Sequence, residues 1–142
     1  VAEKIDEGII IAADTIGYMD NEKFEKPKDR EEAFRNLKKL SGKVNYAVTG
    51  VTIFDKYKNN KISFSDTAAV HFKKMTDEEI NWYIDHEKGV YECAGYSIET
   101  CGALFIDKID GNYSNIVGLP ISRIYDEIKK MGYTINDFET VE

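Results

Sequence analysis

Apolar residues follow strand spacing in some segments of the chain and helix spacing in others. The segment "GIIIAADTIG", residues 8–17, starts with an apolar run, which predicts a buried strand that ends at Asp14. Residues 44–57 and 61–75 carry alternating and β-branched side chains, and the polar "KNN" between them predicts a β-hairpin. Residues 103–109 predict one more strand.

Three other segments have apolar residues at helical spacing, namely residues 29–42, 76–89 and 120–131. Asp29 is a typical N-cap for the first helix, and Gly42 suits its end. The second helix begins with the capping-box pair Thr76 and Glu79. Pro120 suits the first turn of the third. Strands and helices therefore alternate along the chain.

This order of elements predicts an α/β domain with a mixed rather than wholly parallel sheet. No repeat, low-complexity tract or linker interrupts it, so we expect residues 1–142 to form a single domain. Ligand sites in such domains favour the ends of strands, where Asp14 would remain ionised and face a cleft. An aspartate after a strand is also common as a turn cap, so the residues alone leave both roles open.

Composition restricts the class of partner. The formal net charge is −7 and the sequence pI is near 4.9, which argues against binding nucleic acid through clustered basic residues. No apolar run approaches the roughly 20 residues that cross a bilayer, and no signal peptide opens the chain. Cys93 and Cys101 lack metal-site spacing and are expected to be reduced thiols. We therefore expect a cytoplasmic protein without a membrane partner.

Several motifs occur in an order that resembles a known family. They are "AADTIG", "EKPKD", "LSGKVNYAVTGVTIF", "MTDEEINWYI", "CAGYSIETCG" and "NIVGLP". From about Gly8 to Gly132 the chain resembles the Maf family of nucleoside triphosphate pyrophosphatases. This resemblance implies an ITPase/Maf-like fold, in which an elongated, twisted, mixed sheet is flanked by helices.

The resemblance also implies an enzyme that hydrolyses a nucleoside or deoxynucleoside triphosphate to the monophosphate and pyrophosphate, with Mg²⁺ or Mn²⁺ as cofactor. Asp14 matches the family's catalytic aspartate and would bind the metal ion, accept a proton from water, or do both. Lys26, which precedes Pro27, matches a lysine that would direct its ammonium group at the phosphates. Thr15 would either donate its hydroxyl to a phosphate oxygen or cap the following turn.

Glu99 affects the choice of substrate. It stands where the family typically has a glutamine, and a glutamate only accepts hydrogen bonds and adds a negative charge. A branch of the family that acts on methylated guanosine nucleotides such as 7-methyl-GTP carries a glutamate and a cysteine at positions resembling Glu99 and Cys93. The flanking "SIETCGALF" and "GNYSNIVGLPIS" resemble the branch that prefers dTTP and UTP, and we favour the pyrimidine branch.

The start of the chain departs from the family pattern. Relatives carry a strand, a Ser-x-Ser-Pro-Arg-Arg loop and a helix upstream of the aspartate strand, and these are missing here. The loop would supply two arginines for the triphosphate, and a glutamate after it would help hold the metal. We therefore expect an N-terminally truncated Maf-like domain, either a fragment of a longer enzyme or a truncated relative with little activity.

Two further expectations concern partners and class. Relatives suggest a homodimer. The absent arginine loop and Glu99 leave a second class open, a noncatalytic nucleotide-binding or cell-division-associated protein. Outside the motifs, Trp82 is expected to pack in the core with its neighbours on the second helix. Ser114 and Asn115 are expected only to complete a tight turn.

Overall fold

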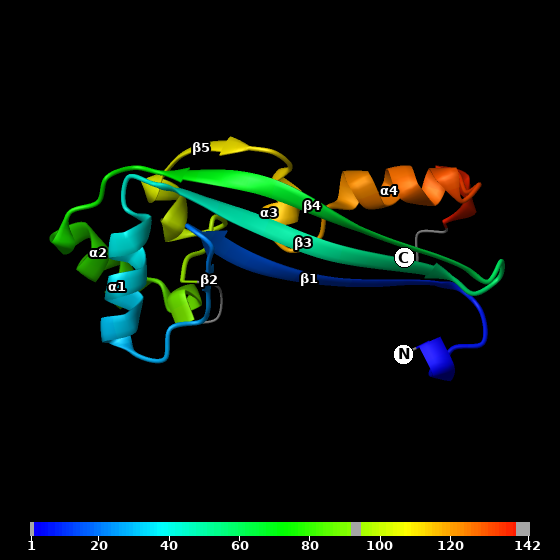
Figure 1. Ribbon diagram of the computed structural model, residues 1–142, viewed down its shortest axis with the longest axis horizontal. Helices are drawn as coiled ribbons and strands as arrows, with labels where there is room; N and C mark the ends of the chain where they lie inside the picture. The colour runs from blue at the N-terminus through cyan, green and yellow to red at the C-terminus, as the bar shows by residue number, and fades with distance from the viewer. Residues whose placement is uncertain (1, 92–94, 139–142) are drawn as a thin grey trace.

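A computed structural model describes residues 2–91 and 95–138. Its centre is a sheet with strand order β2-β1-β3-β4-β5. The strands are β1 (Ile9–Met19), β2 (Glu22–Phe24), β3 (Val44–Asp55), β4 (Asn60–Phe72) and β5 (Ile106–Asp110). Figure 1 shows that β1, β3 and β4 are long and run side by side, which gives the molecule an elongated shape.

Helices flank this sheet, and the predicted α/β class is confirmed. The helices are α1 (Arg30–Leu40), α2 (Asp77–His86), α3 (Tyr113–Ile116) and α4 (Ile121–Lys130). Short 3₁₀ helices cover Ala2–Lys4, Lys88–Tyr91, Cys101–Phe105 and Ile135–Asp137. The sheet was predicted to be mixed, and all the pairings among the described strands are antiparallel.

The predicted helix starts are confirmed by their capping contacts. The Asp29 carboxylate accepts a hydrogen bond of 2.8 Å from the Glu32 backbone N–H. Thr76 and Glu79 form both hydrogen bonds of the capping box. These contacts satisfy backbone donors that the first turn of a helix leaves free, which is why the local sequence was sufficient to place both ends.

Five local predictions were wrong. β1 continues past Asp14 to Met19, and β2 lies in a segment predicted to be loop. Residues 103–105 belong to a 3₁₀ helix, so that β5 begins only at Ile106. Asn115 is buried in α3 rather than in a turn, and Trp82 is 42% exposed and stacks on His86. In each case a contact distant in sequence, or exposure to solvent, decided the outcome.

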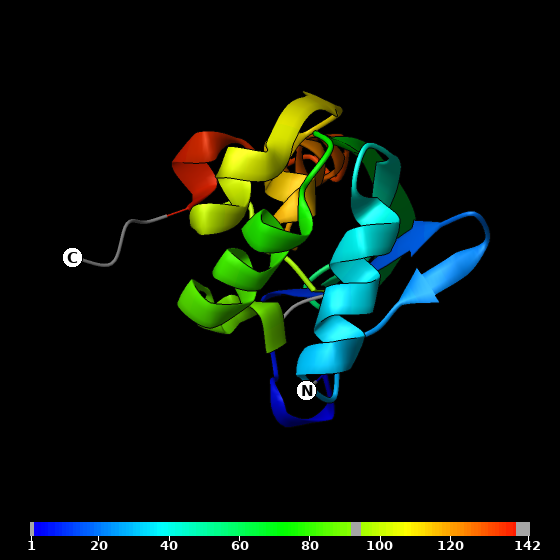
Figure 2. The same cartoon turned by 90° about the vertical axis from the view of Figure 1, so that its left-hand side faces the viewer.

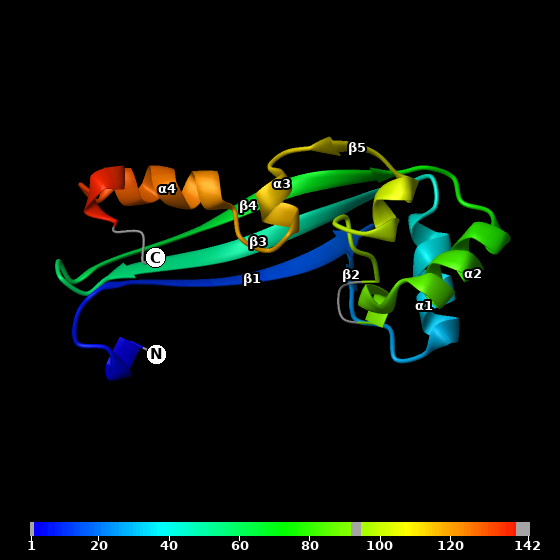
Figure 3. The ribbon, with the colours of Figure 1, turned by 180° about the vertical axis from the view of Figure 1, so that it is seen from behind.

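The side chains form two apolar cores at opposite ends of the long sheet. In the larger one, α1 and α2 pack side by side against the strand ends (Figure 2), around residues that include Leu37, Val70 and Tyr83. In the smaller one, α4 packs Ile124 and Ile128 against the far halves of the strands (Figure 3). The stretch of sheet between the cores carries the polar residues described below.

Glu87 connects the end of α2 to the segment that leads into β5. Its buried carboxylate accepts hydrogen bonds from the backbone N–H groups of Gly89, at 2.8 Å, and Cys101, at 3.3 Å. The Thr100 hydroxyl gives the largest contribution, and with these N–H groups it holds the pKa of Glu87 below its usual value of 4.5, although burial acts in the opposite direction. The ionised form is therefore the one that stabilises this junction.

The sign of this pKa shift predicts how stability changes with pH. A carboxyl whose pKa is lowered by folding contributes stability above its usual pKa and loses that contribution as the pH falls through the folded value. Replacing Glu87 by Gln should therefore lower the free energy of unfolding at neutral pH and flatten its decline between about pH 6 and about pH 3. Urea unfolding across this range measures both effects, and parallel curves for the two proteins would contradict the assignment.

Candidate active site

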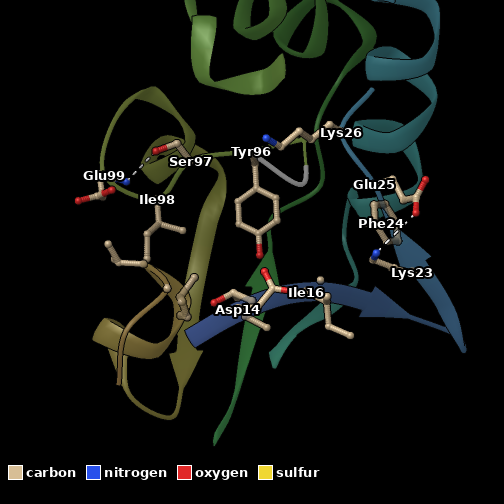
Figure 4. A pocket seen from close by; sticks show the side chains of 16 residues that line it. Asp14, Ile16, Lys23, Phe24, Glu25, Lys26, Tyr96, Ser97, Ile98 and Glu99 are labelled. Atoms are coloured by element: carbon tan, nitrogen blue, oxygen red, sulfur yellow. Dashed lines mark hydrogen bonds and ion pairs between the residues drawn. The ribbon is translucent and has the colours of Figure 1, made fainter. Parts of the chain in front are cut away.

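A pocket of about 550 Å³ opens where β1, β2 and the segments on either side of β5 meet. The residues selected from the sequence, Asp14, Thr15, Lys26 and Glu99, all line it. Figure 4 shows their surroundings, with β1 at the base, the β2 segment on one side and the segment of Glu99 on the other. Residues from five separate stretches of sequence are thus brought around one cavity.

Asp14 lies in the middle of β1 and not at its end, which corrects the prediction. The strand pairs with β3 without interruption from Ile9 to Tyr18, and Asp14 is opposite Gly50. β2 pairs only with residues 17–19 of β1, so among the described residues Asp14 lies on a stretch of β1 that is paired on one side only. The Asp14 side chain is exposed, and the strand rather than a flexible loop fixes its position.

Lys26 reaches the same pocket because the chain reverses tightly after β1. Asp20 and Asn21 adopt φ angles of 53° and 63°, a conformation that these residue types tolerate better than most. β2 then runs back along β1, and Lys26 follows it, next to the buried Pro27. Among the described residues the Lys26 ammonium has no ion-pair partner, which leaves it available to an anion.

Thr15 is held by a chain of hydroxyl hydrogen bonds. Its Oγ1 lies 2.8 Å from Thr49 Oγ1, and the Thr49 hydroxyl donates to the Asn115 backbone carbonyl at 2.9 Å. Since a hydroxyl has one proton and a carbonyl only accepts, Thr15 must be the donor to Thr49. The turn-cap role expected for Thr15 does not match this arrangement, because Thr15 lies within β1 rather than before a turn. Its role as a donor to a phosphate oxygen stays a prediction.

Asn115 fixes the segment that follows β5 to the centre of the sheet. It is fully buried, and its side-chain amide donates to the Ala47 backbone carbonyl at 2.9 Å. Its Oδ1 atom has no hydrogen-bond partner among the described residues. Together with the Thr49 contact, this places Ile116, Val117 and Gly118 along the pocket beside Thr15.

Tyr96 forms another part of the pocket lining and was not selected from the sequence. Its ring is buried edge-on against Phe72, with ring centroids 4.8 Å apart. Its hydroxyl donates to Asn45 Oδ1 at 2.9 Å, and Asn45 Nδ2 donates to the Tyr18 backbone carbonyl at 3.1 Å. Figure 4 shows the hydroxyl directed toward the part of β1 that carries Asp14.

The segment of Glu99 has a shape that only glycine permits at one position. A Cβ atom on Gly102 would lie 2.0 Å from the Ser97 carbonyl oxygen, which excludes any side chain there. The Ser97 N–H donates to the buried Tyr83 hydroxyl at 3.0 Å. Glu99 itself is exposed and lies across the pocket from Lys23 (Figure 4). Cys93, predicted near this segment, lies outside the described residues.

The oxygens of the pocket suit a hard cation that keeps much of its own water. Asp14 offers a carboxylate, and the described residues contain no cluster of three or more His, Cys, Asp or Glu side chains for a cage made by protein alone. Mg²⁺ commonly binds through one or two carboxylates together with substrate phosphates and water. The Asp14 carboxylate is a donor of the type that such an ion prefers, and its role as a metal ligand stays a prediction.

Comparison with known proteins identifies the family. The family model described as Maf-like protein matches residues 1–131, so the chain belongs to this family. It is 44% identical over 133 residues to the dTTP/UTP pyrophosphatase of Carboxydothermus hydrogenoformans, covering 94% of this chain and 72% of that protein. The dTTP/UTP pyrophosphatase of Thermosipho africanus is 45% identical over 120 residues, covering 84% of this chain and 62% of that protein.

A third relative has a similar identity and coverage. The dTTP/UTP pyrophosphatase of Thermosipho melanesiensis is 46% identical over 121 residues, which cover 85% of this chain and 65% of that protein. The chain thus spans 62% to 72% of the length of these three relatives. In the part of the chain that the structure describes, every helix is too short or too polar to cross a membrane.

The hydroxyl chain around Thr49 should contribute measurably to stability. Replacing Thr49 by Val keeps the shape but leaves the Thr15 hydroxyl and the Asn115 carbonyl without their partner, which should lower the free energy of unfolding by about 1–3 kcal/mol. Urea unfolding measures the loss. Thr52, on the same strand, pairs with the exposed Ser63 hydroxyl and provides a matched control, for which Val should cost less than about 0.5 kcal/mol. Equal losses would contradict the assigned network.

Proposed function

We propose that this protein is a nucleoside triphosphate pyrophosphatase that converts dTTP and UTP to the monophosphates and pyrophosphate. The observation that supports this most directly is that Asp14 and Lys26 line one pocket, although β2 and a turn separate them in sequence. The three relatives described above carry this activity in their names. Under this proposal the pocket binds the triphosphate, and hydrolysis takes place beside Asp14.

The chemistry requires one base and a source of positive charge. Water attacks the α-phosphorus, a new oxygen–phosphorus bond forms, and the bond to the bridging oxygen breaks so that pyrophosphate leaves. Asp14 accepts the proton of the water, and Lys26 neutralises charge on the phosphate oxygens. A Mg²⁺ or Mn²⁺ ion held by Asp14 would supply further positive charge and make the water more acidic.

The charge balance of the pocket supports a requirement for added cations. Among the described residues that line it, the acids Asp14, Glu25 and Glu99 outnumber the lysines Lys23 and Lys26. Lys23 is also partly engaged, because its ammonium lies 3.5 Å from the Glu25 carboxylate. A strongly anionic triphosphate would therefore bind weakly without a divalent ion or other positive groups.

The homodimer stays a prediction.

Glu99 favours a second candidate substrate, 7-methyl-GTP. Methylation gives the guanine base a positive charge, and an exposed carboxylate at the pocket would attract it. For dTTP or UTP the same carboxylate adds repulsion toward the phosphates and can accept only from the one N–H of the base. Glu99 therefore discriminates between the two substrates.

The roles of Asp14 and Lys26 can be tested by pyrophosphate release with Mg²⁺ and a panel of triphosphates. Asp14→Asn should lower kcat about 100-fold or more, because the amide cannot accept the proton. Lys26→Ala should lower kcat/KM by about 100-fold. Lys28→Ala, a neighbouring exposed lysine outside the pocket lining, is the matched control and should retain activity. No hydrolysis of any nucleotide by the wild-type protein would refute the proposed function.

Replacing Glu99 by Gln separates the two substrates. With dTTP or UTP, removal of the negative charge should lower KM severalfold, because the repulsion between the carboxylate and the triphosphate disappears. Steady-state kinetics on dTTP, UTP and 7-methyl-GTP provide the measurement. Hydrolysis of 7-methyl-GTP by the wild-type protein that is faster than that of UTP, and is lost in Glu99→Gln, would exclude the pyrimidine assignment.

A further inference from the structure

A second pocket, of about 580 Å³, lies at the end of the molecule that carries α2 (Figure 1), and we call it the α2 pocket. Its volume is within the range of about 300–1,000 Å³ that is usual for small-molecule sites. None of its lining residues lines the candidate active site. They come from the segment after β4, from α2 and from the 3₁₀ helix before β5, namely Lys73, Lys74, Glu78, Glu79, Trp82, Leu104 and Phe105.

Trp82 gives the α2 pocket an open aromatic surface. It is 42% exposed, whereas Tyr83 beside it on α2 is buried. The indole stacks on the His86 ring, with centroids 4.5 Å apart, and the His86 Nδ1–H donates to the Trp82 carbonyl at 2.7 Å. Leu104, which is 59% exposed, adds a second open apolar side chain to the same pocket. The indole is thus held in place while part of its surface remains available for stacking.

Two ammonium groups border this apolar surface. The backbone that carries them is fixed, because the Gly42 N–H donates to the Lys73 carbonyl at 3.0 Å and the Lys73 N–H donates to the Phe105 carbonyl at 2.8 Å. The side chains of Lys73 and Lys74 are exposed, and within residues 2–91 and 95–138 neither ammonium has an ion-pair partner. Both remain available to an anionic group such as a phosphate.

The two acids of the α2 pocket differ in what they can still bind. Glu79 is used by the capping box, in which its Oε2 atom accepts from the Thr76 N–H at 2.7 Å. Glu78 is exposed and makes no such contact with the described part of the chain. A free carboxylate accepts hydrogen bonds from hydroxyl groups, and acidic side chains bind the ribose hydroxyls in this way at nucleotide sites.

We propose that the α2 pocket binds a ribonucleoside monophosphate. The base stacks on Trp82, the ribose hydroxyls donate to Glu78, and Lys73 and Lys74 neutralise the phosphate. A single nucleotide is favoured over a longer nucleic acid, because the net charge of −7 repels a polyanion. This binding is independent of the proposed pyrophosphatase activity, since it uses residues outside the candidate active site.

The fluorescence of Trp82 provides the test, because the chain has one tryptophan. UMP, added without a divalent ion, should change the emission in a saturable way. Replacing Lys73 and Lys74 together by Gln keeps most of each side chain, removes both charges and should raise the Kd about tenfold or more. Lys26→Ala, in the candidate active site, and Lys28→Ala, outside both pockets, are controls that should leave the Kd within about twofold.

Two further measurements test the contacts of the sugar and the base. The nucleotide dUMP lacks the 2′-hydroxyl and should bind severalfold more weakly than UMP, and Glu78→Ala should abolish this difference. Trp82→Leu removes the fluorescent group, so its binding is followed by calorimetry in the Lys26→Ala background. The loss of stacking should raise the Kd about fivefold or more.

Several results would overturn the proposal. Unchanged emission, together with no heat of binding in Lys26→Ala, would show that UMP does not bind the α2 pocket. An equal response to inorganic phosphate would indicate an anion site without selectivity for nucleotides, and an equal response to uridine would exclude the lysines. An unchanged Kd in the double lysine variant would exclude them as well. Failure of nucleotide hydrolysis would refute the proposed function and leave these binding results unaffected.

Discussion

The site depends on the backbone pairing of β1 with β3. Ten consecutive residue pairs, from Ile9 with Asp55 to Tyr18 with Tyr46, hold β1 in one register. A shift by one residue would turn Asp14 to the opposite face of the sheet and Thr15 away from Thr49. The reversal at Asp20 and Asn21 then returns the chain as β2, which carries Lys26 to the pocket. The backbone hydrogen bonds between β1 and β3, rather than flexible side chains, thus set the positions of the residues that catalysis would require.

Buried polar side chains of β3 extend this control to segments far away in the sequence. Asn45 holds Tyr96, and Thr49 together with the Ala47 carbonyl holds Asn115. Such contacts would be costly inside a protein if any partner were missing, so they specify one arrangement of the loops around the sheet. They also fix which atoms donate and which accept. The strand therefore determines the hydrogen-bonding character of the pocket as well as its shape.

The parts of this structure that local sequence encodes were predictable, and the rest depended on distant contacts. Asp29 and Thr76 mark helix starts because capping is a contact within one turn. The end of β1 was misplaced because an apolar run does not reveal how far strand pairing continues beyond Asp14. Family motifs selected Asp14, Lys26 and Glu99, and Thr15 was selected without its partner. The structure places all four around one pocket, and their roles stay predictions. Tyr96 and Asn115 were missed in these roles, since their partners lie 51 and 68 residues away.

The distribution of charge explains why acids and bases can share so small a space. Lys26 lies after β2, while Asp14 lies on a neighbouring part of the sheet and Glu99 across the pocket. Lys23 is the exception, because its ammonium lies 3.5 Å from the Glu25 carboxylate. If Asp14 and Lys26 were in contact, each would neutralise the other, and neither would remain free for a cation or a phosphate. Their separation by the width of the pocket keeps both charges available. A triphosphate with its metal ion carries both signs of charge, and it can satisfy the two sides at once.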